Sequence, residues 1–134
     1  MIIAITSDGI ELISFIAEKF GRAPFIIFYD TEKNTFESLR NPYSNLFGGA
    51  GIQTAQFIIE KNASAVITVD IGSNPLRFLQ STYVKVYSCL RKQVNEVVKD
   101  FLEEKLPEVE QEATMNFGRK WRGGKGRNRN RKIK

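Results

Sequence analysis

The sequence predicts an α/β protein with a mixed, mostly parallel sheet and helices on both faces. Two observations carry this prediction. Short apolar runs alternate with amphipathic segments through the second half of the chain, and Gly, Asn or Pro marks many of their boundaries. Right-handed crossovers between parallel strands then give the strand order 3-2-1-4-5 in a five-stranded sheet, with the second strand antiparallel.

The first half of the chain predicts three strands and one helix. Residues 1–6 form a nearly continuous apolar run, which is typical of a strand buried on both faces. Apolar residues at three- and four-residue spacing predict an amphipathic helix over residues 12–20, which ends at Gly21 in the C-cap position. The runs 25–30 and 35–40 flank a short polar stretch and predict a β-hairpin.

Helical and strand patterns alternate in the second half. They predict, in order, a helix over residues 51–61, a strand over 65–69, a helix over 76–81, a strand over 84–87 and a helix over 94–102. Asn74 suits the N-cap of the middle helix and Pro75 its first helical position. Pro107 is expected to stop the last helix.

The positive charge of the chain lies at its C-terminal end. Residues 1–107 carry a net charge of −1 and residues 108–134 carry +6, which together give the +5 of the whole chain. We therefore expect one domain over residues 1–107, followed by a basic Gly/Arg-rich tail over residues 108–134 that is disordered when free.

The composition excludes several kinds of chemistry. The chain has no histidine and a single cysteine, Cys89, so it cannot form a Ser-His or Cys-His dyad, a His-ligated zinc site or a four-cysteine cluster site. A cytoplasmic location without membrane contact is expected, because there is no signal peptide, no possible internal disulfide and no apolar run of membrane-spanning length. No carboxylate pair falls within catalytic reach, so we predict that the protein is not an enzyme.

A glycine-rich run, Gly48-Gly49-Ala50-Gly51, stands directly before a predicted helix. Such a run predicts either an anion-accepting loop with exposed backbone N–H groups or a tight turn into the helix. In the predicted topology it meets other loops at the carboxyl edge of the sheet, where open α/β sheets bind ligands. The candidate binding residues collected there are Ser7, Asp8, Arg22, Gly48, Gly49, Ala50, Gly51, Gly72, Ser73 and Asn74.

Three of the side chains at this edge allow two interpretations each. Arg22 could contact an anionic ligand bidentately or form a surface ion pair with Asp8. Asp8 could bind a metal or hydrogen-bond its own backbone in a turn. Cys89 could donate a thiolate to a soft metal or serve as a small buried apolar residue.

Several segments resemble, in consistent order over residues 1–106, the dinitrogenase iron-molybdenum cofactor biosynthesis family, which includes NifX and NifB C-terminal-like domains. The matching segments are Met1-Ile2-Ile3-Ala4-Ile5, Phe20-Gly21-Arg22-Ala23-Pro24-Phe25, Asn41-Pro42, Gly48-Gly49-Ala50-Gly51-Ile52, Ile71-Gly72-Ser73-Asn74 and Val84-Lys85-Val86-Tyr87.

This resemblance implies a three-layer ribonuclease H-like fold and a non-catalytic carrier or scaffold for an anionic metal-sulfur cluster, such as an iron-sulfur or molybdenum-containing sulfide. Cofactor-assembly proteins are then the expected partners. Family members often place a histidine where this chain has Lys19, so Lys19 and Arg22 would hold the cluster, or another small anion, by charge. The chain also lacks the radical-enzyme cysteine motif of multidomain relatives, so their synthase activity is not expected here.

The tail supports an alternative function. It interleaves cations with glycine and aromatic residues, which suits phosphate backbones and base stacking, so the protein could instead bind RNA or DNA. Equally, the tail could serve only solubility or assembly. The residues that would contact nucleic acid are Arg119, Lys120, Trp121, Arg122, Lys125, Arg127, Arg129, Arg131 and Lys132.

Overall fold

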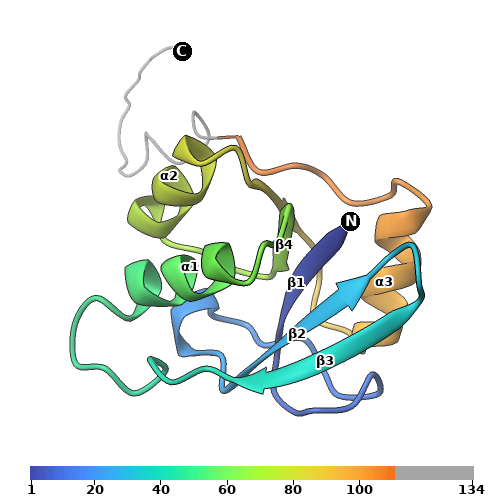
Figure 1. The fold of residues 1–134 in the computed structure, drawn as a ribbon, viewed down its shortest axis with the longest axis horizontal. Coiled ribbons are helices and arrows are strands. Elements are labelled where there is room, and N and C mark those ends of the chain that lie inside the picture. The colour runs from blue at the N-terminus through green and yellow to red at the C-terminus, as the bar shows by residue number, and fades with distance from the viewer. Residues whose placement is uncertain (111–134) are drawn as a thin grey trace.

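A five-stranded mixed sheet lies between helices in the computed structural model, which describes residues 1–110 (Figure 1). The strand order is β3-β2-β1-β4-β5, with β2 antiparallel to its neighbours and β4 and β5 parallel to β1. The predicted ribonuclease H-like fold and strand order are therefore confirmed. The elements are β1 (Ile2–Ser7), η1 (Phe20–Arg22), β2 (Phe25–Asp30), β3 (Thr35–Arg40), α1 (Ala50–Glu60), β4 (Ala65–Thr68), α2 (Ser73–Ser81), β5 (Lys85–Ser88) and α3 (Val94–Leu102).

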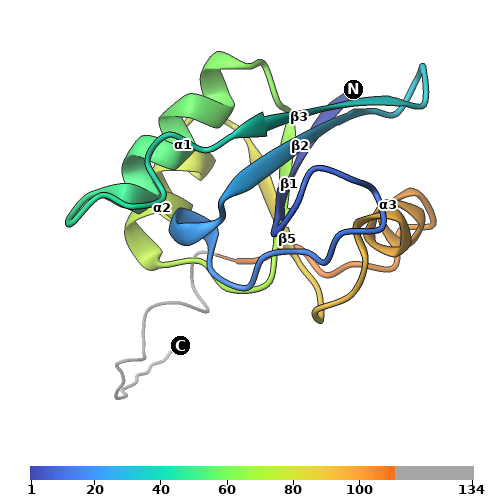
Figure 2. The ribbon, with the colours of Figure 1, turned by 90° about the horizontal axis from the view of Figure 1, so that it is seen from below.

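Helices cover both faces of the sheet and create two apolar cores. Helices α1 and α2 lie on one face and α3 on the other, which is seen most clearly from below (Figure 2). Along β1, Ala4 faces the first core with Ile58 of α1, whereas Ile5 faces the second core with Val97 of α3. This alternation follows from the two-residue period of a strand and fixes which loops share a side.

The predicted helix over residues 12–20 is wrong. The segment after β1 is a loop whose backbone bonds to the ends of other elements: Ala17 N–H donates to the Thr6 carbonyl (2.9 Å) and Ile16 N–H to the Lys92 carbonyl (2.9 Å). The apolar spacing correctly marked Ile16 and Phe20 as buried, but Ile13 is 66% exposed. Long-range backbone bonds thus replace the local helical ladder, and only the short η1 turn is helical.

The start of α2 also differs from its prediction. The helix begins at Ser73 with Gly72 as its N-cap, two positions before the predicted cap at Asn74. Pro75 therefore occupies the third helical position, where its missing N–H still costs no helical hydrogen bond. The Asn74 side chain instead accepts a hydrogen bond from Arg77 Nη2 (2.8 Å).

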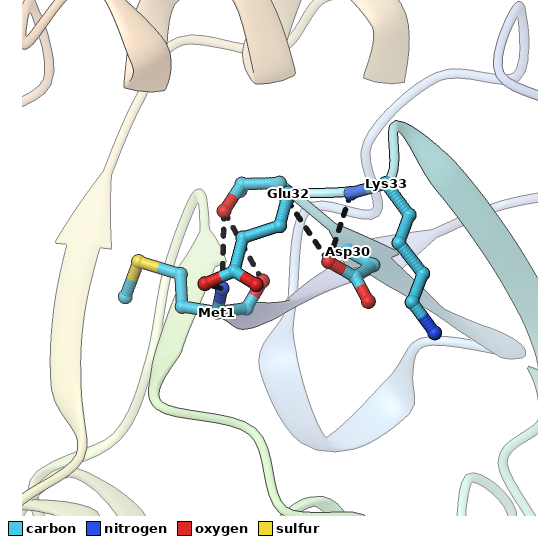
Figure 3. A network of polar contacts seen from close by, with 5 residues as sticks. Met1, Asp30, Glu32 and Lys33 are labelled. Carbon is cyan, nitrogen blue, oxygen red and sulfur yellow. Dashed lines mark hydrogen bonds and ion pairs between the residues drawn. The ribbon is translucent and has the colours of Figure 1, made fainter.

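The turn between β2 and β3 is held by a polar network (Figure 3). Asp30 Oδ1 accepts hydrogen bonds from the backbone N–H groups of Glu32 (2.9 Å) and Lys33 (3.2 Å), which lowers the pKa of its carboxyl. The Met1 amino group lies 3.6 Å from Glu32 Oε2. Together these contacts close the turn of the predicted hairpin and tie the chain start to it.

The chain remains attached to the sheet beyond α3. Ser88 N–H donates to the Pro107 carbonyl (3.1 Å) and Val109 N–H to the Val86 carbonyl (2.7 Å), so residues 107–109 line the outer edge of β5. The sheet contact thus continues two residues past the predicted domain boundary. No helix within residues 1–110 has the length and apolar character needed to cross a bilayer. The predicted nucleic-acid contacts, Arg119 to Lys132, lie outside the described residues.

Candidate anion-binding site

Three loops meet closely at the carboxyl edge of the sheet on the α1/α2 side. A Cβ atom added to Gly21 would lie 2.8 Å from the Gly51 nitrogen, and one added to Gly51 would lie 2.9 Å from Pro75 Cγ. Such distances leave no room for side chains at either glycine. Glycine at these two positions therefore lets η1, the start of α1 and the start of α2 pack together.

The glycine run divides into two parts with different roles. Gly51 is needed for the close packing just described, whereas a Cβ on Gly48 or Gly49 would meet no atom of residues 1–110 within 4 Å. Gly49 is the N-cap of α1 and has a φ of 77°, a conformation that side chains rarely adopt. The tight-turn interpretation thus explains Gly49 and Gly51, while Gly48 stands exposed beside the helix start.

The first turns of α1 and α2 leave their backbone donors free. Among residues 1–110, no group accepts from the N–H of Ala50, Gly51 or Ile52 in α1, or of Ser73 or Asn74 in α2. Neither helix has a side-chain cap or an acidic residue in its first turn. Because these N-termini lie against each other, their partial positive charges add at one place.

Two cations flank the paired helix starts. Arg22 Nη1 donates to the carbonyls of Ser44 (2.9 Å) and Leu46 (2.6 Å), so it holds the loop that leads to the glycine run. Its other guanidinium N–H groups have no partner among residues 1–110. Lys19 is exposed on the segment that pairs with Asp70, directly before the α2 loop. The region around the helix starts thus combines free N–H donors with positive side chains.

Ser7 and Asp8 lie apart from this cluster, towards α3. The buried Ser7 Oγ donates to the Gly9 carbonyl (2.7 Å) and closes the turn after β1. Asp8 pairs with Arg91, whose guanidinium also lies over the Phe15 ring at 5.1 Å. The proposed ion pair between Asp8 and Arg22 is therefore absent from residues 1–110, and Arg91 is a partner that sequence spacing did not indicate.

Cys89 lies on the α3 side, in a hollow of about 460 Å³ that also contains Lys92 and Asp100. Burial raises the pKa of its thiol to about 11, although the nearby Lys92 charge opposes this shift. The thiol is therefore protonated at neutral pH, a poor state for binding a soft metal. No group of three or more Cys, His, Asp or Glu residues within residues 1–110 is arranged to hold a metal ion.

The size of a hollow does not select the functional site. A hollow of about 540 Å³ beside Tyr87 and Phe101 is lined by apolar and acidic side chains and lies on the α3 side of the sheet. Acidic side chains would repel an anion. The donors and cations on the α1/α2 side therefore indicate the better candidate.

Asn41 is a structural residue of the site whose role the sequence did not reveal. It is 2% exposed, and its Nδ2 donates to the Ala23 carbonyl (3.0 Å) and to Thr54 Oγ1 (3.0 Å). Its Oδ1 accepts from the Tyr43 N–H (3.1 Å). Asn41 thereby anchors the glycine-bearing loop to η1 and α1. The Asn41-Pro42 pair carries part of the family resemblance, but no sequence pattern indicates this hydrogen-bonding role.

Comparison with known proteins agrees with this architecture. The sequence profile of the family described as "Dinitrogenase iron-molybdenum cofactor" matches residues 1–104. The apo form of the orange protein from Desulfovibrio gigas is 29% identical, with a TM-score of 0.78 over 81% of this chain and 92% of that one. A Thermotoga protein described as a candidate NifB is 32% identical, with a TM-score of 0.71 over 80% and 91%.

A more distant structure shares the fold alone. A candidate dinitrogenase from Methanocaldococcus jannaschii is 16% identical, with a TM-score of 0.62 over 81% of this chain and 94% of that one. Among curated proteins, none matches the chain significantly. The family profile covers most of the chain and the Thermotoga protein shares nearly a third of its aligned residues. The chain therefore belongs to the dinitrogenase iron-molybdenum cofactor family.

Proposed function

We propose that this protein is a non-catalytic carrier or scaffold for an anionic metal-sulfur cluster or a related cofactor precursor. The observation that carries the proposal is the pair of adjacent, uncapped helix N-termini of α1 and α2. Each such terminus favours a nearby negative charge by about 0.3–1 kcal/mol at an exposed site and by up to about 2 kcal/mol when partly buried. Cofactor-assembly proteins are the partners expected of a family with this description.

The chain would hold the cluster by hydrogen bonds and charges directed at its outer atoms. Backbone N–H groups of Gly51 and Ser73 would donate to the outer sulfur or oxygen atoms, and Lys19 and Arg22 would neutralise charge. Direct protein-metal bonds are not required for this mode of binding, which suits a chain without histidine and with a protonated Cys89. Release of the cargo would then need no ligand exchange at the metal.

Anaerobic reconstitution with iron, molybdate and sulfide tests the proposal. Metal content and visible absorbance of the repurified protein are the measurements, and we expect bound metal in the wild-type chain. A chain ending at Glu110 is the second arm, because a basic tail also attracts polyanions. Metal bound by the full chain and lost from the shortened one would contradict binding at the helix starts, as would no bound metal in either.

The variant Gly72→Asp tests the site itself. A Cβ on Gly72 would lie 3.7 Å from Pro75 Cδ, an ordinary contact, so a side chain fits there. Its carboxylate would cap α2 and occupy the free donors, and we expect cluster binding to weaken by about tenfold or more. Asn95→Asp is the matched control, since it adds the same charge at the start of α3, where Asn95 Oδ1 already accepts the Glu96 N–H (2.9 Å). Equal metal loss in both variants would show that only net charge matters.

A further inference from the structure

Within residues 1–110, one edge of the sheet is covered by other backbone and the other edge is not. Residues 107–109 cover the β5 edge, where Glu108 bridges Tyr87 in antiparallel fashion. At the opposite edge, β3 pairs only with β2 among residues 1–110, and it runs along the outside of the molecule (Figure 1). An uncovered strand edge presents a row of unpaired backbone groups, which is a template for another strand.

The register identifies which groups of β3 face outward. Asn41 N–H donates to the Pro24 carbonyl (2.9 Å), so hydrogen-bonded pairs recur at every second residue along the β2–β3 ladder. Thr35, Glu37 and Leu39 therefore bond to β2. The N–H and carbonyl groups of the alternate residues, Phe36, Ser38 and Arg40, point away from the sheet, and no group within residues 1–110 accepts from these N–H groups.

The side chains of these alternate residues lie on the α3 face of the sheet. Phe36 is 41% exposed, and Ile10, 52% exposed, lies nearby because Ser38 Oγ donates to its carbonyl (2.6 Å). The Arg40 guanidinium lies over the Phe25 ring at 5.4 Å. The open edge thus carries an apolar group at one end, a cation at the other and Ser38 between them.

We propose that β3 pairs antiparallel with β3 of a second copy of this chain, with Ser38 facing Ser38 across a two-fold axis. This pairing joins the two sheets into one, and the contact is isologous. Phe36 of each copy then lies opposite Arg40 of the other, a favourable cation-aromatic pair. Ile10 of each copy lies beside the axis on the same face, where the two side chains can exclude water.

Neighbouring registers are worse for specific reasons. A shift by two residues in one direction places Glu37 opposite Glu37, and like charges directly opposite are destabilising. The shift in the other direction places Phe36 opposite Pro42, which has no N–H to donate. A shift by one residue would align outward-facing groups with inward-facing ones and lose the ladder. The sequence of β3 therefore favours one self-complementary register.

Sedimentation equilibrium of the full chain, from about 10 μM to about 1 mM, tests this pairing because dimer formation depends on concentration. We expect a monomer-dimer equilibrium in the wild type. Ser38→Pro removes an outward N–H that β2 does not use, so it should weaken the dimer by about tenfold or more while the hairpin survives. Ser38→Ala is the matched control, because it removes only the hydroxyl and should retain the dimer.

A cross-link checks the register without relying on the proline variant. In a Cys89→Ala background, Ser38→Cys should form a disulfide-linked dimer under mild oxidation, since the Cα atoms of a hydrogen-bonded pair lie about 5.5 Å apart. Glu37→Cys, which faces Leu39 in this register, should cross-link far less. A wild-type chain that stays monomeric up to about 1 mM, an unaffected Ser38→Pro dimer or equal cross-linking at both positions would overturn the proposal.

Discussion

The α1/α2 side and the α3 side of the carboxyl edge present helix starts in opposite states. At α3, Val94 N–H donates to the Ser14 carbonyl (2.8 Å), Asn95 N–H to the Leu12 carbonyl (2.8 Å), and the Gln93 N–H to Glu96 Oε1 (3.3 Å). At α1 and α2 the equivalent donors have no partner among residues 1–110. The same fold thus bonds one helix N-terminus to its own chain and leaves the two adjacent ones, where we propose that the anion binds, without a partner among residues 1–110.

The largest expected effect on stability comes from adding a side chain where the loops on the α1/α2 side pack most closely. Gly21→Ala would place a Cβ 2.8 Å from backbone atoms of Gly51, which cannot move independently. We expect a loss of about 2–3 kcal/mol in the free energy of unfolding, measured by urea denaturation. Gly48→Ala is the control, because its Cβ would meet no atom of the described part of the chain within 4 Å, so stability should stay nearly constant. Equal losses would mean that the loops do not pack as described.

On the α3 side, the Cys89 thiol is expected to react slowly at neutral pH. Because burial raises the pKa of Cys89 to about 11 from an ordinary 9.0, its thiolate fraction at pH 7 should be about a hundredfold lower than in an exposed peptide. Alkylation by iodoacetamide should therefore be slow at pH 7 and accelerate up to about pH 11. Urea-unfolded protein is the control. If the folded chain reacted as fast as the unfolded chain at pH 7, burial would not be raising the pKa of the Cys89 thiol.

Adding a cap at the start of α2, or removing one at the start of α3, should change the free energy of unfolding by smaller amounts. Gly72→Asp caps an open helix start and should raise the free energy of unfolding of the ligand-free protein by about 0.5–1 kcal/mol. Glu96→Ala removes the acceptor of the Gln93 N–H at the α3 start and should lower the free energy of unfolding by about as much. Thermal unfolding at low ionic strength measures both. Changes of the same sign would show that capping does not distinguish the two sides.

The smallest effect is the pH dependence of the ion pair beside α3. Lys92 Nζ lies 2.5 Å from Asp100 Oδ2, and this hydrogen bond lowers the pKa of Asp100 below its ordinary value of 3.8. A carboxylate with a lowered pKa stabilises the fold above its unfolded pKa, and the contribution disappears as pH falls through the folded pKa. The difference in stability between wild type and Lys92→Met should therefore shrink below about pH 3.8. Urea titrations at several acidic pH values would reveal a constant difference if the pair is unimportant.

The sequence predicted the sheet well because strands and turns here are specified locally. The apolar run 25–30, its turn and residues 35–40 became β2 and β3 with the predicted bounds. The helix predicted over residues 12–20 is wrong because its apolar residues do not share one face: Ile16 is buried in the second core and Phe20 in the first. No local pattern reports the hydrogen bond from Ala17 to Thr6 that replaces a helical turn.

The candidate site could be predicted only in part for a similar reason. Glycine spacing located the loops around Gly51 and Gly72, and topology placed them at one edge of the sheet. The separation of Ser7 and Asp8 from that cluster depends on the Asp8–Arg91 contact, which joins residues far apart in the chain. The roles of Lys19 and Arg22 towards a ligand stay predictions.

The segment over residues 107–109 makes the folded unit longer than the part of the chain that the family profile recognises. That profile ends at residue 104, whereas Val109 packs against the first core and its carbonyl accepts from Gln80 Nε2 (3.0 Å). A chain cut at residue 104 would lose residues 107–109, and β5 would become a second edge strand with unpaired backbone groups that can pair with other chains. Fusion points, protease sites and domain swaps are therefore better placed after Glu110 than at the boundary drawn from sequence similarity.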